Sequence, residues 1–226
     1  MSRGATKTSA TCAIVGSLAL LVGTYLHPMG ADPNDAVAAF TEYAADHLWV
    51  ASHLTQLAGV ALMVVALLLL TEELAARGRG WERVAAGGAV ASLALAAALQ
   101  AVDGVALKRM VDAWVSAPAE HERATFHAAF AVRQIEIGFA SMLCLLLGVT
   151  ASLYGALLLV DHTYPRWLGG LAIAGGVPTV VAGVVIAYTG FSDLAMSINM
   201  PASVVLLLWM VMLGRCMWSR AEGRDE

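Results

Sequence analysis

Three pairs of polar residues lie inside or beside long apolar stretches, and the members of each pair are three residues apart. The pairs are His53 and Gln56, Gln100 and Asp103, and Arg133 and Glu136. Residues at this spacing lie on one face of a helix. Charged and polar groups near hydrocarbon are costly and usually have a purpose. These six residues are therefore the candidate ligand-binding site.

Two interpretations of this polar layer stay open. Arg133 would neutralise its charge by pairing with Asp103 or with Glu136, and such a pair could simply fix the register of two helices. Alternatively, His53 and the two glutamines would complete a polar pocket. That pocket would bind a small or lipophilic ligand, or a partner helix.

Catalysis is a weaker alternative. Asp103 and Glu136 would act as an acid–base pair if burial kept one of them protonated, as in an enzyme that modifies a lipid or isoprenoid. The sequence has no nucleophile elbow, phosphate-binding loop, dinucleotide fingerprint or aspartate-rich prenyl-diphosphate motif. We therefore assign no catalytic residue and expect a non-enzymatic protein.

The histidines suggest a further alternative, a redox protein that holds a metal ion or haem b. The candidate ligands are His27, His47 and His127. A haem with two histidine ligands would use His47 together with His127 or His27. The three cysteines are isolated in the sequence, which disfavours a thiolate metal site.

The elements that position these residues are apolar helices. Hydrophobic residues make up 59% of the 226 residues and charged residues 13%, against about 25% charged in soluble domains. We predict an all-α polytopic membrane helix bundle that forms a single domain over residues 1–226. Its six transmembrane spans are 11–26, 49–70, 84–102, 132–160, 167–189 and 202–218. The lipid bilayer is the expected partner, and the net charge of −4 disfavours nucleic acid.

Basic residues predict the orientation. Four of them, Lys108, Arg109, Arg123 and Arg133, fall in or beside the second outer loop. The others would be cytoplasmic if both termini are cytoplasmic: Arg3, Lys7, Arg77, Arg79, Arg83, Arg166, Arg215, Arg220 and Arg224. The positive-inside rule therefore predicts that both termini lie in the cytoplasm. We expect the membrane to be a bacterial inner membrane.

The third and fourth spans are expected to extend beyond the membrane. Helical spacing continues past Val102, and a helix break and restart follows at Ser116-Ala117-Pro118. A helix from there to Val160 would be on the order of 60 Å long, about twice the thickness of the hydrocarbon. The two spans would then form an extracytoplasmic helical hairpin.

Glycines recur at intervals of seven residues in several spans, a spacing typical of close helix packing in membranes. They are Gly16 and Gly23 in the first span, Gly148 and Gly155 in the fourth, and Gly169, Gly176, Gly183 and Gly190 in and just after the fifth. Pro178 should kink the fifth span. A hinge or ligand slot is the alternative to simple packing.

Two stretches of the chain resemble a known group of proteins. They are residues 100–108 (QAVDGVALK) with 132–136 (VRQIE), and a loop that opens His27-Pro28 and leads to Trp49 and His53. Together they are similar to uncharacterised multi-pass membrane proteins of actinobacteria. The resemblance implies a helical membrane domain of unknown function, and it assigns no catalytic residue.

Overall fold

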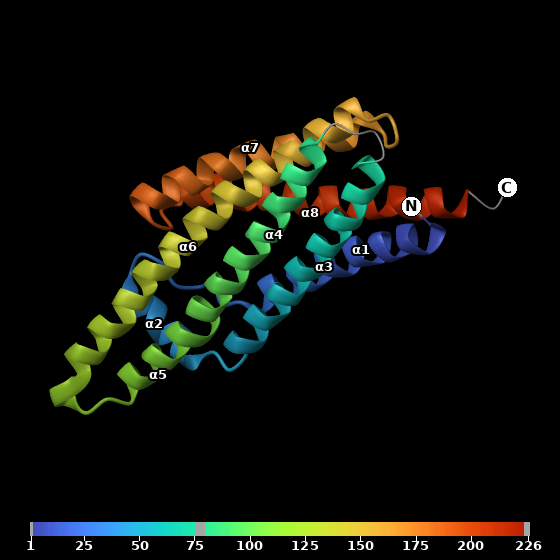
Figure 1. Ribbon diagram of the computed structural model, residues 1–226. Helices are drawn as coiled ribbons and strands as arrows, with labels where there is room; N and C mark the ends of the chain where they lie inside the picture. Colours follow the sequence, from blue (N-terminus) through green and yellow to red (C-terminus); the bar gives the residue numbers. More distant parts are fainter. Residues whose placement is uncertain (1, 76–79, 224–226) are drawn as a thin grey trace.

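The computed structural model describes residues 2–75 and 80–223, and within them every regular element is helical (Figure 1). The elements in chain order are α1 (Arg3–Leu26), α2 (Ala36–Ala45), α3 (Trp49–Ala75), α4 (Trp81–Gln100), η1 (Ala101–Leu107), α5 (Lys108–Val115), α6 (Ala119–Val160), α7 (Arg166–Thr189) and α8 (Asp193–Glu222). Among these described residues, six helical runs are long and apolar enough to cross a membrane. The prediction of an all-α polytopic bundle is therefore confirmed.

The long helices lie side by side, with α1 packed on α3 and α8, and α7 packed on α6 and α8. Both chain termini lie at one end of the bundle, which we call the termini end (Figure 1). Helices α2 and α5 and the first half of α6 lie at the other, which we call the hairpin end (Figure 1). Arg77, Arg79 and Arg224, three of the basic residues used to predict orientation, lie outside the described residues.

The third and fourth long runs are the longest, as the sequence predicts. Helix α4 continues through η1 into α5 as one run of 35 residues, and α6 alone has 42 residues. The break between them falls at the predicted Ser116-Ala117-Pro118, with Pro118 at the N-cap of α6 and Glu120 and Glu122 in its first turn. The two runs therefore form a helical hairpin.

Helix α2 is an element that the sequence analysis missed, because we expected an outer loop there. The Asp35 side chain caps it by accepting hydrogen bonds from the backbone N–H groups of Val37 and Ala38. Its residues Phe40 and Tyr43 are buried at the hairpin end. Ten residues are too few for a stable isolated helix, so α2 depends on this packing.

Several helices begin before the predicted spans. Helix α1 begins at Arg3, and α8 begins at Asp193 and continues through Pro201. The hydroxyl of Ser192 caps α8 by accepting from the backbone N–H of Ala195. A hydropathy pattern locates the apolar centre of a helix, whereas the caps that end it lie in the polar flanks.

The heptad glycines in α6 and α7 lie against each other. A Cβ atom added to Gly169 would lie 2.5 Å from the carbonyl oxygen of Gly155. One added to Gly176 would lie 2.7 Å from that of Gly148, and one on Gly183 would lie 2.9 Å from a backbone atom of α6. Any side chain there would push the two backbones apart.

Gly16 and Gly23 make the corresponding contact between α1 and α3. A Cβ atom at Gly16 would lie 2.7 Å from the carbonyl oxygen of Gly59, and one at Gly23 would lie 2.7 Å from that of Ser52. Gly190 differs from the other heptad glycines. It ends α7 with φ 63° and ψ −150°, and its nearest neighbours would be 3.8 Å from an added Cβ. Its role is this backbone conformation, which side chains disfavour, rather than close packing.

We predict that Gly176→Ala lowers the free energy of unfolding by about 1–3 kcal/mol, since the added methyl group has no space against α6. The matched control is Gly170→Ala on the same helix, where nothing lies within 4 Å of an added Cβ. Alanine favours helix by about 1 kcal/mol over glycine, so the control should be neutral or stabilising. Unfolding of the purified protein in mixed micelles measures both changes. Equal effects of the two substitutions would contradict the packing role of Gly176.

Candidate functional site

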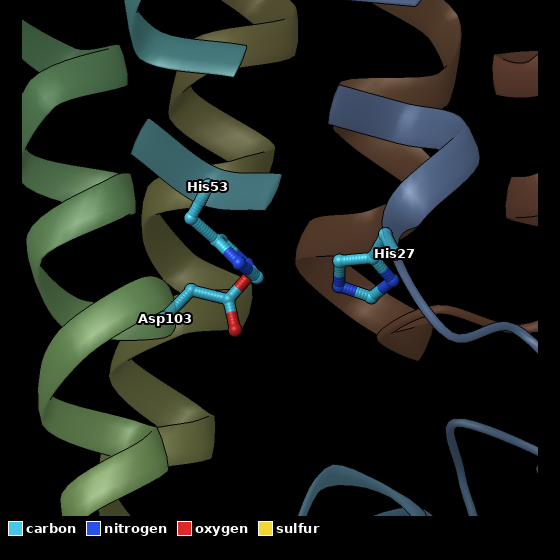
Figure 2. Close-up of side chains that lie close together, drawn as sticks. All are labelled: His27, His53 and Asp103. Atoms are coloured by element: carbon cyan, nitrogen blue, oxygen red, sulfur yellow. The ribbon is translucent and has the colours of Figure 1, made fainter. Parts of the chain in front are cut away.

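Three groups able to bind a metal ion meet at the hairpin end of the bundle (Figure 2). His27 follows the last residue of α1, His53 lies on α3, and Asp103 lies on η1. One ligand atom from each falls within 4.8 Å of the other two. His53 Nε2 and Asp103 Oδ2 are 3.0 Å apart, and the two imidazole rings have centroids 5.0 Å apart. Distant parts of the sequence thus form one cluster, which we call the His–Asp cluster.

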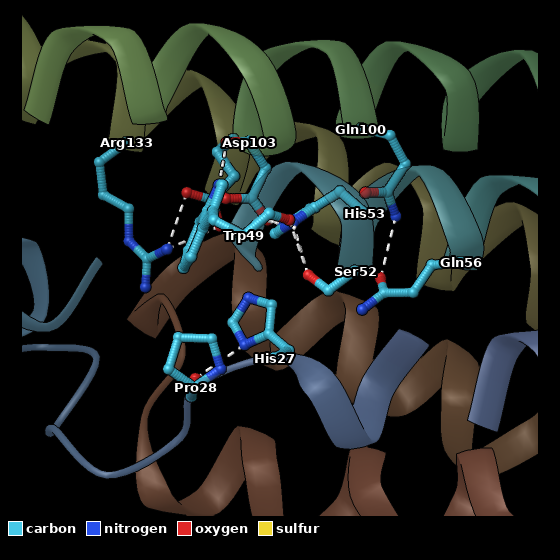
Figure 3. Close-up of polar contacts among 10 residues, drawn as sticks. His27, Pro28, Trp49, Ser52, His53, Gln56, Gln100, Asp103 and Arg133 are labelled. Carbon is cyan, nitrogen blue, oxygen red and sulfur yellow. Dashed lines mark hydrogen bonds and ion pairs between the residues drawn. The ribbon is translucent and has the colours of Figure 1, made fainter. Parts of the chain in front are cut away.

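Both histidines use the same ring nitrogen to hold their orientation (Figure 3). His53 Nδ1 lies 2.7 Å from the carbonyl oxygen of Trp49, and His27 Nδ1 lies 2.7 Å from that of Pro28. A carbonyl oxygen only accepts hydrogen bonds, so each Nδ1 carries the hydrogen and donates it. The Nε2 atom of the neutral His27 imidazole then has a free lone pair, whereas His53 Nε2 faces Asp103 Oδ2 at 3.0 Å.

The π-helical segment η1 brings Asp103 to His53. A Cβ atom on the next residue, Gly104, would lie 2.5 Å from His53 Cβ, so glycine is what lets η1 and α3 approach. The indole Nε1 of Trp49 donates to the Asp103 carbonyl oxygen at 3.0 Å. Single π-helical turns inside α-helices are rare and occur frequently at functional sites. This irregularity was not predicted from the sequence.

Aromatic rings enclose the His–Asp cluster. Trp49 is 1% exposed, and its ring centroid lies 4.7 Å from that of His27 and 4.7 Å from that of His53. The Tyr43 ring from α2 lies 4.2 Å from Trp49. The unpredicted helix α2 therefore covers the cluster. Such a wall excludes water and strengthens electrostatic interactions inside it.

Arg133 and Glu136 form a separate buried ion pair on α6. Arg133 Nη1 donates to both Glu136 oxygens at 2.7 Å, and the two residues are 6% and 2% exposed. The guanidinium carbon lies 4.9 Å from the Phe191 ring centroid and 5.7 Å from that of Tyr43, and Nη2 reaches the Pro33 carbonyl oxygen at 3.4 Å. Arg133 thereby joins α6 to α2, to the segment before α2 and to the turn before α8.

The two glutamines make a third contact. Gln100 Nε2 donates to Gln56 Oε1 at 3.1 Å. The six candidate residues of the polar layer are thus joined in pairs across or along helices, as His53–Asp103, Arg133–Glu136 and Gln56–Gln100. Asp103 Oδ1 and Gln100 Oε1 are buried and have no hydrogen-bond partner among the described residues. These two oxygens remain available to a ligand.

The histidine pairing differs from the sequence prediction. His47 and His127 are exposed, and neither is part of the His–Asp cluster. The cluster instead combines His27 with His53. The feature of the sequence that indicates the proximity of His27 to His53 is Gly23. Its close contact with Ser52 places the end of α1, one turn later, beside the start of α3.

Burial changes the proton affinity of two groups outside the spans. It lowers the pKa of His27 below the ordinary 6.5, and the neighbouring His53 acts in the same direction. His27 is therefore neutral at pH 7, with its lone pair free. Burial also raises the pKa of Tyr43 to about 12, so this phenol keeps its proton.

Comparison with known proteins places this geometry in a family. The family model described as a domain of unknown function, DUF4386, matches residues 6–214. No curated protein and no solved structure gives a significant match. The match confirms the resemblance to uncharacterised proteins that the sequence analysis described.

We predict that Arg133→Met lowers the free energy of unfolding by about 3–5 kcal/mol, because it leaves the Glu136 carboxylate buried without a partner. The double variant Arg133→Met/Glu136→Met should recover most of this loss. Arg123→Met, which removes an exposed arginine from the same helix, is the control and should change little. A double variant as unstable as Arg133→Met alone would show that the ion pair itself is not the source of the effect.

Proposed function

The chain belongs to the DUF4386 family, and from that premise we propose that it binds a single divalent transition-metal ion within the membrane-spanning bundle. The ligands would be His27 Nε2, His53 Nε2 and an oxygen of Asp103. The observation that carries the proposal is the shared orientation of the two imidazoles. Each donates through Nδ1 to a backbone carbonyl, and the Asp103 carboxylate lies beside them.

This arrangement matches the known chemistry of metal sites. Histidine ligands usually donate their second N–H to a carbonyl or carboxylate, which fixes the tautomer. Imidazole suits zinc, iron, nickel and copper, and two histidines with one carboxylate occur in zinc and non-haem iron sites. With metal–ligand bonds of about 2.1 Å, tetrahedral ligand atoms lie about 3.4 Å apart. One ligand atom of each residue in the cluster lies within 4.8 Å of the others, so the ligand atoms would move inward to bind an ion.

A single ion fits better than haem b. The Trp49 ring lies 4.7 Å from each imidazole, and the imidazole centroids are 5.0 Å apart. A porphyrin bound between His27 and His53 would have to displace this indole. An ion needs only the space between the ligand atoms.

The enzymatic alternative has less support than metal binding. Both oxygens of Glu136 accept hydrogen bonds from Arg133, which favours a structural role over acid–base catalysis with Asp103. A bound metal ion is also compatible with the small-ligand interpretation of the polar layer. Three protein ligands leave one tetrahedral position for water or a small ligand. A small polar ligand would therefore bind to the ion itself.

We further propose that the protein lies in a bacterial inner membrane with both termini in the cytoplasm. The support is the distribution of basic residues along the helices. Those at the termini end are Arg3, Lys7, Arg83, Arg166, Arg215 and Arg220, whereas the hairpin end has Lys108, Arg109 and Arg123 exposed or half-buried and Arg133 in an ion pair. The His–Asp cluster would then face the extracytoplasmic side.

Cysteine labelling on intact cells tests the orientation. In a chain with its three cysteines replaced by alanine, Ser116→Cys should react with a membrane-impermeant maleimide. Ser2→Cys, exposed at the other end, should react only after the cells are permeabilised. The reverse pattern would contradict the proposed orientation.

We expect metal-free protein to take up about one equivalent of Zn²⁺, and His53→Ala to weaken this binding by at least about tenfold, since it removes a ligand. His47→Ala, which changes an exposed histidine at the same end, is the control and should bind like the unaltered protein. Competition against a chromophoric chelator measures the affinity. Equal affinities of His53→Ala and the unaltered protein would overturn the proposal.

The same titration predicts a pH dependence. Protons compete with the metal for imidazole nitrogen, so affinity should fall as the pH decreases. The pKa of His27 is lowered below the ordinary 6.5, so this histidine is predominantly neutral at pH 7 and above. The contribution of His27, measured as the affinity ratio between unaltered protein and His27→Ala, should therefore change little above pH 7 and shrink at more acidic pH. A ratio that already falls between pH 8 and pH 7 would contradict this assignment.

A further inference from the structure

A hollow lies between the turn from α6 to α7 and the last turns of α8. Both of these segments lie at the termini end of the bundle, away from α2 and α5 (Figure 1). The volume of the hollow is about 480 Å³. Cationic, hydroxyl and apolar side chains line it together. The lining residues used here are Thr163, Pro165, Met212, Arg215, Ser219 and Arg220.

Arg220 is fixed within the wall of this hollow. Its Nη1 donates to the Thr163 carbonyl oxygen, and its Nη2 lies 3.6 Å from Glu73 Oε1. The guanidinium carbon lies 5.1 Å from the Tyr164 ring centroid. Glu73 is 8% exposed and balances the charge of Arg220. Arg220 therefore builds the wall, and its Nε is buried without a hydrogen-bond partner among the described residues.

Arg215 supplies a positive charge that is not balanced in this way. It is exposed, and among the described residues it forms no ion pair. Ser219 follows it four residues later, so the guanidinium and the hydroxyl lie on the same face of α8. A guanidinium beside a hydroxyl, at the mouth of a hollow, suits a phosphate group.

The face of α8 that precedes Arg215 along the helix is apolar and exposed. Leu208 and Val204 precede Arg215 by seven and eleven residues, which places them on the same side of the helix, about 10 Å and 16 Å further along it. They are 49% and 63% exposed. A phosphate ligand with a hydrocarbon chain would cover this face, whereas a free phosphate ion would leave it open.

We propose that this hollow binds the headgroup of an anionic glycerophospholipid, with an acyl chain along α8. The phosphate would contact Arg215 and Ser219, and Met212 and Pro165 would contact the glycerol backbone. Trp167 and Trp218 are 48% and 38% exposed at the same end, as expected for indoles at the depth of lipid headgroups. Basic pockets between transmembrane helices are known binding sites for such headgroups.

Native mass spectrometry of the delipidated protein tests the proposal with defined lipids. The probes are dioleoyl phosphatidylglycerol, dioleoyl phosphatidylcholine as the zwitterionic comparison, and inorganic phosphate as the free anion. We expect the anionic lipid to bind about fivefold more tightly than the zwitterionic one, as one well-placed basic residue provides. Arg215→Gln should remove this preference, and millimolar phosphate should not displace the lipid.

The control is Arg83→Gln, which removes an exposed arginine from the same end of the bundle but outside the hollow. It should keep the full lipid preference. A preference unchanged in Arg215→Gln, or lost equally in both variants, would overturn the site and indicate non-specific surface charge. Displacement of the lipid by phosphate at equal concentration would overturn the lipid as occupant. None of these results depends on metal binding at the other end.

Discussion

Polar side chains buried in an apolar bundle must find their partners within the protein, because hydrocarbon provides no hydrogen bonds. The Arg133–Glu136 pair satisfies this constraint and organises the hairpin end around it. Its guanidinium also lies against Phe191 and Tyr43 and contacts the Pro33 carbonyl oxygen. One buried cation thus contacts both α2 and the turn before α8.

Close packing of helix backbones is the second constraint that positions the hairpin end. Glycines at Gly16 and Gly23 let α1 approach α3, and Gly148, Gly155, Gly169 and Gly176 let α6 approach α7. The close packing of α1 on α3 fixes the position of the end of α1, and therefore the position of His27. The residues of the His–Asp cluster are thus positioned by contacts between small residues at a distance from them. A side chain at Gly23 would push α1 away from α3. This movement would separate His27 from His53.

Much of this fold was predictable, because hydropathy, proline breaks and heptad glycines are signals within single helices. The pairing of Arg133 with Glu136 follows from their spacing on one helix, and it was among the predicted alternatives. His27 beside His53 was not predicted, since it depends on how two helices pack and on where α1 ends. Helix α2 was missed because its stability comes from burial of Phe40 and Tyr43 against other elements. The π-helical η1 was missed for the same reason, as Gly104 and the Trp49 indole act across helices.

The charges of the polar layer indicate how the protonation of the His–Asp cluster would change when an ion binds. The six residues of the polar layer include two carboxylates, Asp103 and Glu136, and one guanidinium, that of Arg133, while the nearby His27 is neutral at pH 7 because burial lowers its pKa. Arg133 balances Glu136, so Asp103 requires one further positive charge. A proton on His53 Nε2 would supply that charge and would be donated to Asp103 Oδ2 across the 3.0 Å contact, since two lone pairs would repel each other there. A divalent ion would replace that proton and use the same two atoms. Metal binding would therefore release a proton and leave the hydrogen bonds from each Nδ1 unchanged.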